Sequence, residues 1–328
     1  MSASLGKANY KYQRGLTDLG NGAFAWMQPD GGWGWSNAGL VTDGDQSLLV
    51  DTLFDLPKTR DMLDAMRKAA PRAAKTIGTL VNTHHNGDHC YGNELVGAGE
   101  IIASAHACEE MKRESPAVLQ NFMKAAPGLG QLGAYIQHCF GAFDFDGITQ
   151  TLPTKTFSGR MTRQVGAKRV ELIEVGPAHT GGDILVHVPE DRTVFTGDIL
   201  FIEGTPIMWA GPASNWIAAC EEILALDCET IVPGHGPVTD QRGVKAVRDY
   251  LIYIRDETKK RFDAGMKANE AARDIALRDY DSWGDAERIA VNVASLYREF
   301  SHDHTAPNVA ELFGQMAQIW NDRKNRRK

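Results

Sequence analysis

The sequence predicts a layered α/β domain followed by a helical extension. Short apolar segments typical of buried strands alternate with amphipathic helical segments from about residue 20 to residue 240. Several of the strand-like segments end in a glycine-containing turn that carries a histidine or an aspartate. The remaining residues have helical patterns. We therefore expect a main domain in residues 1–240 and a helical extension, residues 241–328, packed on it.

The first part of the main domain is expected to contain strands around a single long helix. Residues 1–20 have weak patterning and are expected to be a loosely held lead-in. Between residues 21 and 52, the turn sequences DGG and DGD separate apolar runs, which predicts three strands joined by tight turns. A helix is expected over 56–70, and the apolar runs at 75–83 and 100–105 are expected strands.

A helical insertion, expected over about residues 106–145, interrupts the strand pattern. Strands resume in the segments ITQTLPTKTFSG, RVELIEVG, DILVHVP and RTVFTGD, and a helix at roughly 215–226 precedes a last strand in ETIVPGHG. In the extension, two apolar stripes recur at helical spacing, and packing is their expected role. The stripes consist of Ile289, Val293, Leu296, Tyr297 and Phe300, and of Val309, Leu312, Phe313, Met316, Ile319 and Trp320.

Composition argues against a nucleic-acid-binding protein and favours a soluble cytoplasmic one. The formal net charge of −7 argues against a general nucleic-acid surface, and the basic run at 323–328 is expected to be a solvated end. The five cysteines are scattered without a CxxC pair, which fits a reducing compartment. The first residues show no secretory signal and no apolar run is long enough to span a membrane, so a cytoplasmic location without membrane partners is expected.

Metal-capable side chains follow four of the expected strands. The first group lies in THHNGDH, residues 83–89; the others are His179 in VGPAHTGGD, Asp198 in FTGD and His235 in PGHG. Strand ends in layered α/β proteins are where sites are built, and the neighbouring glycines permit tight turns. A lone histidine after a strand is more often structural than a ligand, but the four places together indicate a metal site.

This ordered set resembles the metallo-β-lactamase fold superfamily, whose motif is His-x-His-x-Asp-His followed by a His, an Asp and a His. The resemblance covers roughly residues 20–240 and implies a four-layer αββα sandwich with a metal-binding catalytic function. It implies one metal site at His84, residue 86 and His179, and a second at Asp88, His89 and His235, with Asp198 bridging them. In this register, His85 falls on an unassigned position.

Asn86 departs from the motif, because the motif has its second histidine there. An amide oxygen is a harder and weaker ligand for zinc than a neutral imidazole. We therefore expect one or two zinc ions, with the second site the tighter, while iron or manganese remains possible. The alternative is that Asn86 turns away and hydrogen-bonds its loop, with His85 or water in its place.

The ligand types predict a hydrolase that uses a metal-bound hydroxide. A divalent ion lowers the pKa of bound water toward ~7, and Asp88 or Asp198 is expected to orient the attacking water and accept its proton. A serine or cysteine nucleophile is not needed, and Cys90 is expected to be a buried structural residue.

The expected substrate is a small, hydrophobic ester, lactone, thioester or amide. In the superfamily, the early hairpin often hangs over the metal site, so Trp33 and Trp35 are candidate substrate contacts. Met208 and Trp209 follow Asp198 and are candidates for the same cleft. The insertion and the extension are expected to wall the cleft or to form a homodimer face.

Three alternatives stay open. One is β-lactamase-like or sulfatase activity at the same site, and another is an iron-dependent dioxygenase, which a hard Asn86 ligand favours. The third is a ligand-binding protein with residual metal. Ligands and fold alone do not decide among these chemistries.

Overall fold

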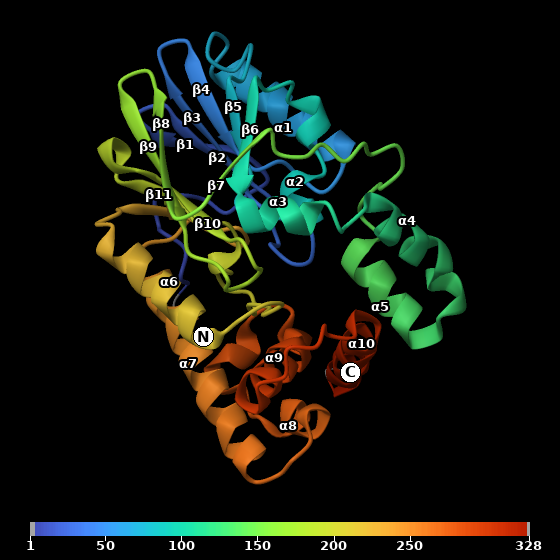
Figure 1. Ribbon diagram of the computed structural model, residues 1–328. Helices are drawn as coiled ribbons and strands as arrows, with labels where there is room; N and C mark the ends of the chain where they lie inside the picture. Colours follow the sequence, from blue (N-terminus) through green and yellow to red (C-terminus); the bar gives the residue numbers. More distant parts are fainter. Residues whose placement is uncertain (1–3, 327–328) are drawn as a thin grey trace.

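Two β-sheets stacked face to face form the centre of the protein, with helices on both outer sides (Figure 1). The computed structural model describes residues 4–326. The first sheet has the strand order β1-β2-β3-β4-β5-β6-β7, antiparallel from β1 to β4 and parallel from β4 to β7. Its strands are β1 (Gly15–Gly20), β2 (Ala23–Met27), β3 (Ala38–Asp43), β4 (Gln46–Val50), β5 (Thr79–Val81), β6 (Glu100–Ser104) and β7 (Lys155–Phe157).

The second sheet has the order β12-β11-β10-β9-β8. Its strands are β8 (Arg160–Val165), β9 (Lys168–Glu174), β10 (Ile184–Val188), β11 (Thr193–Phe195) and β12 (Thr230–Val232). Strands β9 and β11 are both antiparallel to β10, and β12 is parallel to β11. The carboxyl ends of β9, β11 and β12 therefore lie at the same edge of this sheet.

Apolar side chains from the inner faces of the two sheets form a common core. The branched residues Val41, Leu48, Val170 and Val186 are all fully buried in it. Because successive strand residues point to opposite faces, the remaining apolar residues of these strands face the outer helices. Helix α1 (Leu56–Ala69) packs Met62 and Met66 onto the first sheet.

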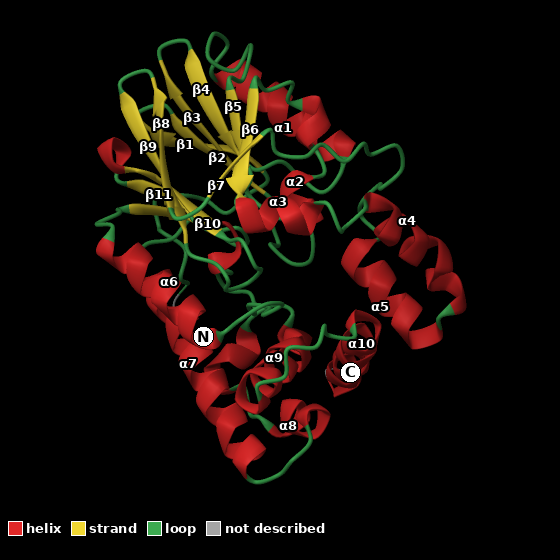
Figure 2. Ribbon diagram, viewed as in Figure 1, coloured by secondary structure: helices red, strands yellow, loops and turns green. Residues whose placement is uncertain are grey.

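Helices α6 (Ala213–Ala225) and α7 (Gln241–Asp263) belong with the second sheet. Their residues Trp216 and Val247 share one buried cluster with Leu185 and Val194 of that sheet. The layer order is thus helix, sheet, sheet, helix, which is the predicted four-layer sandwich (Figure 2).

The expected insertion and extension are helical and meet each other. The insertion contains α3 (Ala105–Met111), α4 (Pro116–Ala125) and α5 (Gly130–Phe140), and the extension contains α7, α8 (Ala268–Asp274), α9 (Ile289–Ser301) and α10 (Val309–Arg326). Phe140 lies 6.0 Å from Phe313 between ring centroids, which joins α5 to α10. Among residues 4–326, no helix is both long and apolar enough to cross a membrane.

One expectation from the sequence was wrong and one strand was missed, and both concern edge strands. Residues 15–20 are not a loose lead-in but strand β1, paired with β2, and residues 160–165 form an unexpected strand, β8, paired with β9. Both strands lie at sheet edges, where partly exposed positions carry polar residues. Their sequences, GLTDLG and RMTRQV, therefore lack the apolar run that identifies a buried strand.

Candidate metal centre

Six histidine and aspartate side chains converge where β5, β9, β11 and β12 end. They form two groups, in each of which the candidate ligand atoms all lie within 4.8 Å of one another. The first group is His84, His179 and Asp198, and the second is Asp88, His89 and His235. The sequence separates these residues by up to about half the chain, and the shared edge of the two sheets brings them together.

Asp198 lies between the two groups. Its Oδ1 is 3.1 Å from His89 Nε2, and its Oδ2 is 3.4 Å from the Nε2 atoms of both His179 and His235. One carboxylate therefore faces histidines of both groups, which is the arrangement of a bridging ligand. The burial of Asp198, at 4% exposure, leaves these histidines as its main polar neighbours.

The four histidines are oriented alike, with Nδ1 turned outward and Nε2 turned toward the centre. Each Nδ1 faces an oxygen that accepts its proton. The acceptors are Thr83 Oγ1 for His84 at 3.1 Å, Asp51 Oδ2 for His89 at 2.9 Å, the Ile207 carbonyl for His179 at 2.6 Å and the Gly31 carbonyl for His235 at 3.1 Å. An N–H bond at Nδ1 fixes the tautomer and leaves the Nε2 lone pair free for a metal ion.

Asp51 is a functional residue that the sequence interpretation missed. It is 2% exposed, and besides His89 it accepts hydrogen bonds from the amide and the hydroxyl of Thr83, both at 2.7 Å. Because Thr83 Oγ1 donates to Asp51, its lone pairs are left to accept from His84. Asp51 thus orients one histidine of each group. The available signal was the polar residue directly after the strand SLLV, which is the same pattern that marked the other four places.

The donor set fits a bound cation. Three buried atoms at the centre, His84 Nε2, His89 Nε2 and Asp198 Oδ1, make no well-oriented hydrogen bond among the described residues, although His89 Nε2 and Asp198 Oδ1 lie 3.1 Å apart. Buried polar atoms are nearly always paired, so their convergence calls for a partner that binds lone pairs. Imidazole nitrogens with carboxylate oxygens are the ligands that zinc and similar divalent ions take in proteins.

The ionisation of these groups is consistent with cation binding. Burial lowers the pKa of His84 well below its ordinary value, with nearby His89 adding to the effect, and lowers the pKa of His179 to about 4. Burial alone also lowers the pKa of His89, but Asp198 and the other carboxylates outweigh burial and raise this pKa well above its ordinary value. In the metal-free protein, a protonated His89 therefore supplies positive charge beside the carboxylates. Binding of a metal ion would release this proton.

Asn86 points into the first group. It stands at the N-terminus of the short helix α2 (Gly87–Cys90), and its Oδ1 lies 2.8 Å from His179 Nε2. His179 donates through Nδ1 and has a pKa of about 4, so its Nε2 presents a lone pair. Two acceptors this close repel each other unless both bind one cation or the amide is turned to present its NH₂, and the other end of the amide, Nδ2, lies 3.3 Å from His85 Nε2. The side chain of Asn86 is therefore placed as a ligand or a ligand neighbour.

His85 faces away from both groups. Its Nδ1 lies 3.1 Å from Glu110 and its Nε2 lies 3.1 Å from Glu114, both in or next to α3. Burial lowers the pKa of His85, but hydrogen bonds to these two carboxylates outweigh burial and raise the pKa to about 10. The residue thus ties the motif loop to the helical insertion, in agreement with its unassigned position in the motif.

Asp183 fixes the turn that follows His179. It is buried, and its carboxylate accepts hydrogen bonds from the amide of Thr180 at 2.9 Å and from the Thr180 hydroxyl at 2.6 Å. Burial raises the pKa of Asp183 to about 7. Cys90 is also buried, and burial raises the pKa of its thiol well above the ordinary value, as expected for a structural residue.

A group of aromatic side chains, which we call the aromatic wall, includes residues of two loops that contact His179 and His235. Trp33, in the loop after β2, lies 5.9 Å from Phe140 of α5 and 5.7 Å from Phe313 of α10, and Trp209 stacks on the same Phe313 at 6.4 Å. The loop that carries Trp33 also supplies the Gly31 carbonyl to His235. The structure therefore brings Trp33 and Trp209 together on Phe313.

Trp35 and Met208, the two other expected substrate contacts, pack against other parts of the protein. Trp35 packs on Phe143 at 4.8 Å, with the guanidinium of Arg14 4.8 Å from its ring. Met208 is 2% exposed, so its side chain is part of the core beneath the aromatic wall. We regard Trp35 and Met208 as packing residues.

Known proteins resemble this chain in sequence. A model of the metallo-beta-lactamase superfamily matches residues 31–235. The 2,4-dinitroanisole O-demethylase subunit alpha of Nocardioides sp. (strain JS1661) is 26% identical over 60% of this chain and 51% of its own length. The beta-lactamase-like protein 2 homolog of Caenorhabditis elegans is 23% identical over 83% and 81% of the two chains. The hydroxyacylglutathione hydrolase of Rhizobium meliloti (strain 1021) is 25% identical over 58% of this chain and 61% of its own length.

Solved structures show the same architecture. The sec-alkylsulfatase Pisa1 from Pseudomonas sp. superposes with a TM-score of 0.68 at 17% identity, over 91% of this chain and 52% of the sulfatase. A metallo-beta-lactamase from Pontibacter korlensis superposes with a TM-score of 0.56 at 17% identity, over 73% and 99% of the two chains. The chain thus spans about half the length of the demethylase subunit and of the sulfatase. Since the family model covers more than half of the chain, the protein belongs to the metallo-beta-lactamase superfamily of metal-dependent hydrolases.

Proposed function

We propose that the protein hydrolyses a small, hydrophobic ester, lactone, thioester or amide with the help of divalent metal. The observation that carries the proposal is the convergence of four histidine Nε2 atoms on Asp198 and Asp88, with three buried atoms that make no well-oriented hydrogen bond among the described residues. Burying unpaired polar atoms costs folding free energy, so their convergence supports a role as ligands.

The two groups of side chains would hold two ions. His84, His179 and Asp198, with the Asn86 oxygen as a fourth and weaker donor, would form the first site. Asp88, His89 and His235, with Asp198 shared, would form the second. Zinc suits these nitrogen and oxygen donors, and the amide oxygen of Asn86 makes iron or manganese a competitor at the first site.

Asp88 is the best-placed residue to handle a proton. A bound divalent ion supplies water that ionises near neutral pH and polarises the bond to be cleaved. The side chain of Asp88 is 13% exposed, more than the 4% of Asp198, and its Oδ2 lies 3.3 Å from His235 Nε2. The other carboxylate oxygen of Asp88 would orient the attacking water and accept its proton, while Asp198 would face both groups.

The aromatic wall supports a hydrophobic substrate. Trp33 and Trp209 offer large apolar faces beside the centre, and apolar faces bind acyl or aromatic groups by removing them from water. The similar proteins are named as a hydroxyacylglutathione hydrolase, an alkylsulfatase and an O-demethylase subunit. Proteins similar to this chain therefore act on several kinds of chemical bond. Sulfate esters and β-lactams therefore belong in any substrate test.

The test combines metal analysis with a substrate panel. Purified protein is assayed with chromogenic esters, lactones, thioesters, amides, β-lactams and alkyl sulfates, beside the variants Asp88→Asn and Asp198→Asn. We expect turnover of an acyl substrate that chelator removes and zinc restores, with a loss of at least about 100-fold in either variant. Red-brown protein that contains iron and consumes oxygen with a thiol substrate would favour a dioxygenase. Metal-bound protein without any turnover would favour a binding role.

A further inference from the structure

The position of His179 depends on the loop 201–211. The Ile207 carbonyl accepts the Nδ1 proton of His179 at 2.6 Å, and the amides of Trp209 and Ala210 donate to the His179 carbonyl at 3.0 and 3.1 Å. The loop thus sets both the backbone position and the tautomer of this histidine. Any residue that fixes the loop acts on the first metal site.

Helix α9 of the C-terminal extension holds this loop on both sides of Ile207. Asn292 donates through Nδ2 to the Pro206 carbonyl at 2.8 Å, and its Oδ1 accepts from the Met208 amide at 2.8 Å. One turn earlier, Arg288 donates to the Thr205 carbonyl at 3.0 Å. Three polar contacts, two from Asn292 of α9 and one from Arg288 directly before this helix, therefore hold the loop residues that flank the Ile207 carbonyl.

The side-chain amide of Asn292 is buried, and all of its hydrogen-bonding groups have partners. The residue is 1% exposed, and its Nδ2 also donates to the Tyr250 hydroxyl of α7 at 2.9 Å. Both hydrogens and the oxygen of the amide thus have partners. Removal of the side chain would leave the Pro206 carbonyl and the Met208 amide without these hydrogen bonds. Because buried polar groups without partners are unfavourable, the loop would be expected to shift.

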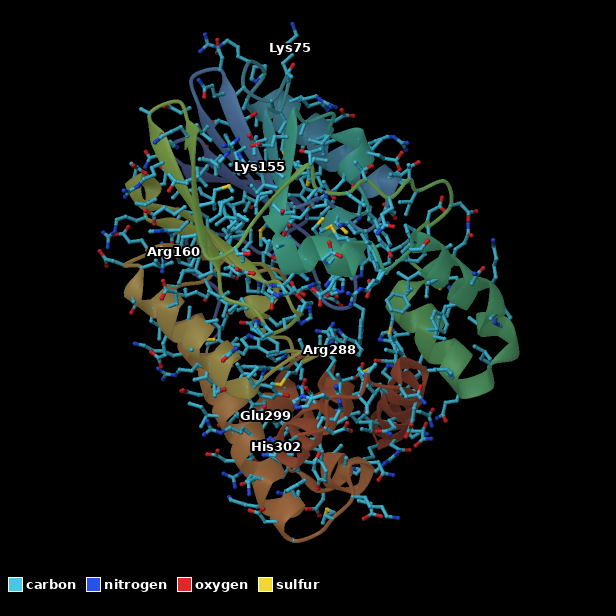
Figure 3. The ribbon with its side chains drawn as sticks, viewed as in Figure 1. Lys75, Lys155, Arg160, Arg288, Glu299 and His302 are labelled. Atoms are coloured by element: carbon cyan, nitrogen blue, oxygen red, sulfur yellow. The ribbon has the colours of Figure 1, made fainter. Side chains whose placement is uncertain are left out.

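Arg288, the residue before α9, contacts the aromatic wall. It is 2% exposed, it pairs with Asp285 at 2.9 Å, and its guanidinium lies 4.5 Å from the Trp33 ring and 5.2 Å from the Phe201 ring. The Phe201 ring in turn stacks on His235 at 5.0 Å. Figure 3 shows Arg288 where the helical extension meets the loops of the sandwich.

We propose that Asn292 is a positioning residue for the first metal site, acting through the Ile207 carbonyl on His179. The proposal rests on the proposed metal function. Asn292 lies outside residues 31–235, the part that the superfamily model matches. The C-terminal extension would therefore help to position a ligand of the metal site. The second site should be independent of Asn292, because Asp51 and Gly31 orient His89 and His235.

The test is an equilibrium zinc titration of the metal-free full chain against a competing chromogenic chelator. His179→Ala and His235→Ala assign the two binding steps to the first and the second site. Asn292→Ala removes the amide, and Asn292→Leu removes its hydrogen bonds while nearly keeping its volume. Ser295→Ala is the matched control, since Ser295 is a buried polar residue on the same helix, at 8% exposure. Thermal melting of the metal-free proteins checks that each variant is folded.

We expect both Asn292 variants to weaken the first step by about 10- to 100-fold and to leave the second step unchanged. The absorption bands of Co²⁺ at the first site should shift in the same variants and not in Ser295→Ala. Equal weakening of both steps, or no weakening of the first, would overturn the role of Asn292 while leaving the metal function intact. Wild-type protein that binds no zinc would overturn the metal function and this inference with it.

Discussion

The side-chain oxygen of Asn86 lies 2.8 Å from Nε2 of His179, inside the first group of candidate ligands. The superfamily motif has a histidine at this position, and the amide that replaces it still faces the centre. The two groups therefore differ in donor strength although their geometry is similar. This difference predicts unequal metal affinity.

Asn86→His should strengthen the first zinc-binding step by about 10-fold or more, because imidazole is a better zinc ligand than an amide oxygen. Asn86→Ala should weaken the same step if the amide oxygen is a ligand. Chelator-competed zinc titration measures both. Wild-type protein that already holds two tight ions, unchanged by either substitution, would show that Asn86 contributes nothing to binding.

Asp51→Asn should weaken the second site by about 10- to 100-fold, because an amide no longer fixes the Nδ1 proton of His89 as a carboxylate does. Asp51 also orients Thr83, which faces His84, so a smaller effect on the first site is expected. Asp45→Asn is a suitable control, since Asp45 is an exposed residue in the turn between β3 and β4. Zinc affinity equal to wild type in Asp51→Asn would contradict the role assigned to this residue.

The pKa of Asp183, raised by burial to about 7, predicts a pH-dependent stability. An unfolded chain protonates this carboxyl only below about pH 4, so between roughly pH 4 and 7 the folded state binds the extra proton. The contribution of Asp183 to the free energy of unfolding is thus greatest at low pH and falls as the pH rises through 7. Asp183→Asn should therefore gain stability relative to wild type from pH 4 to pH 8 in urea denaturation of the metal-free proteins. A difference that does not change with pH would show that this carboxyl titrates normally.

Trp33→Ala should lower kcat/KM for a hydrophobic acyl substrate by about 10-fold, mainly through KM, because it removes apolar surface that would contact the substrate. Trp35→Ala is the matched control, since Trp35 is also half-buried but packs on Phe143. A similar decrease in both variants would point to a general disturbance of the loop rather than a substrate contact.

The strands around the metal groups were predictable from the sequence, because each is a short apolar run that ends in a glycine-containing turn. Edge strands β1 and β8 were not, since their exposed positions carry polar residues. The six histidine and aspartate residues of the two groups followed from the motif spacing, and the structure brings them together.

Residues that act through hydrogen bonds were harder to find. Asp51 and Asn292 reach the centre through His89 and Ile207, and neither lies in a motif segment. Trp33 and Trp35 are two residues apart on the same loop, yet Trp33 packs on Phe140 and Phe313 while Trp35 packs on Phe143. The sequence alone did not show which aromatic residues each tryptophan would contact.

A crystal structure of the protein soaked in zinc, with anomalous data at the zinc edge, tests the two-site account most directly. We expect one peak among Asp88, His89, His235 and Asp198 and a second, weaker peak among His84, His179, Asp198 and the Asn86 oxygen. Density that lacks an anomalous peak in both groups would contradict the account.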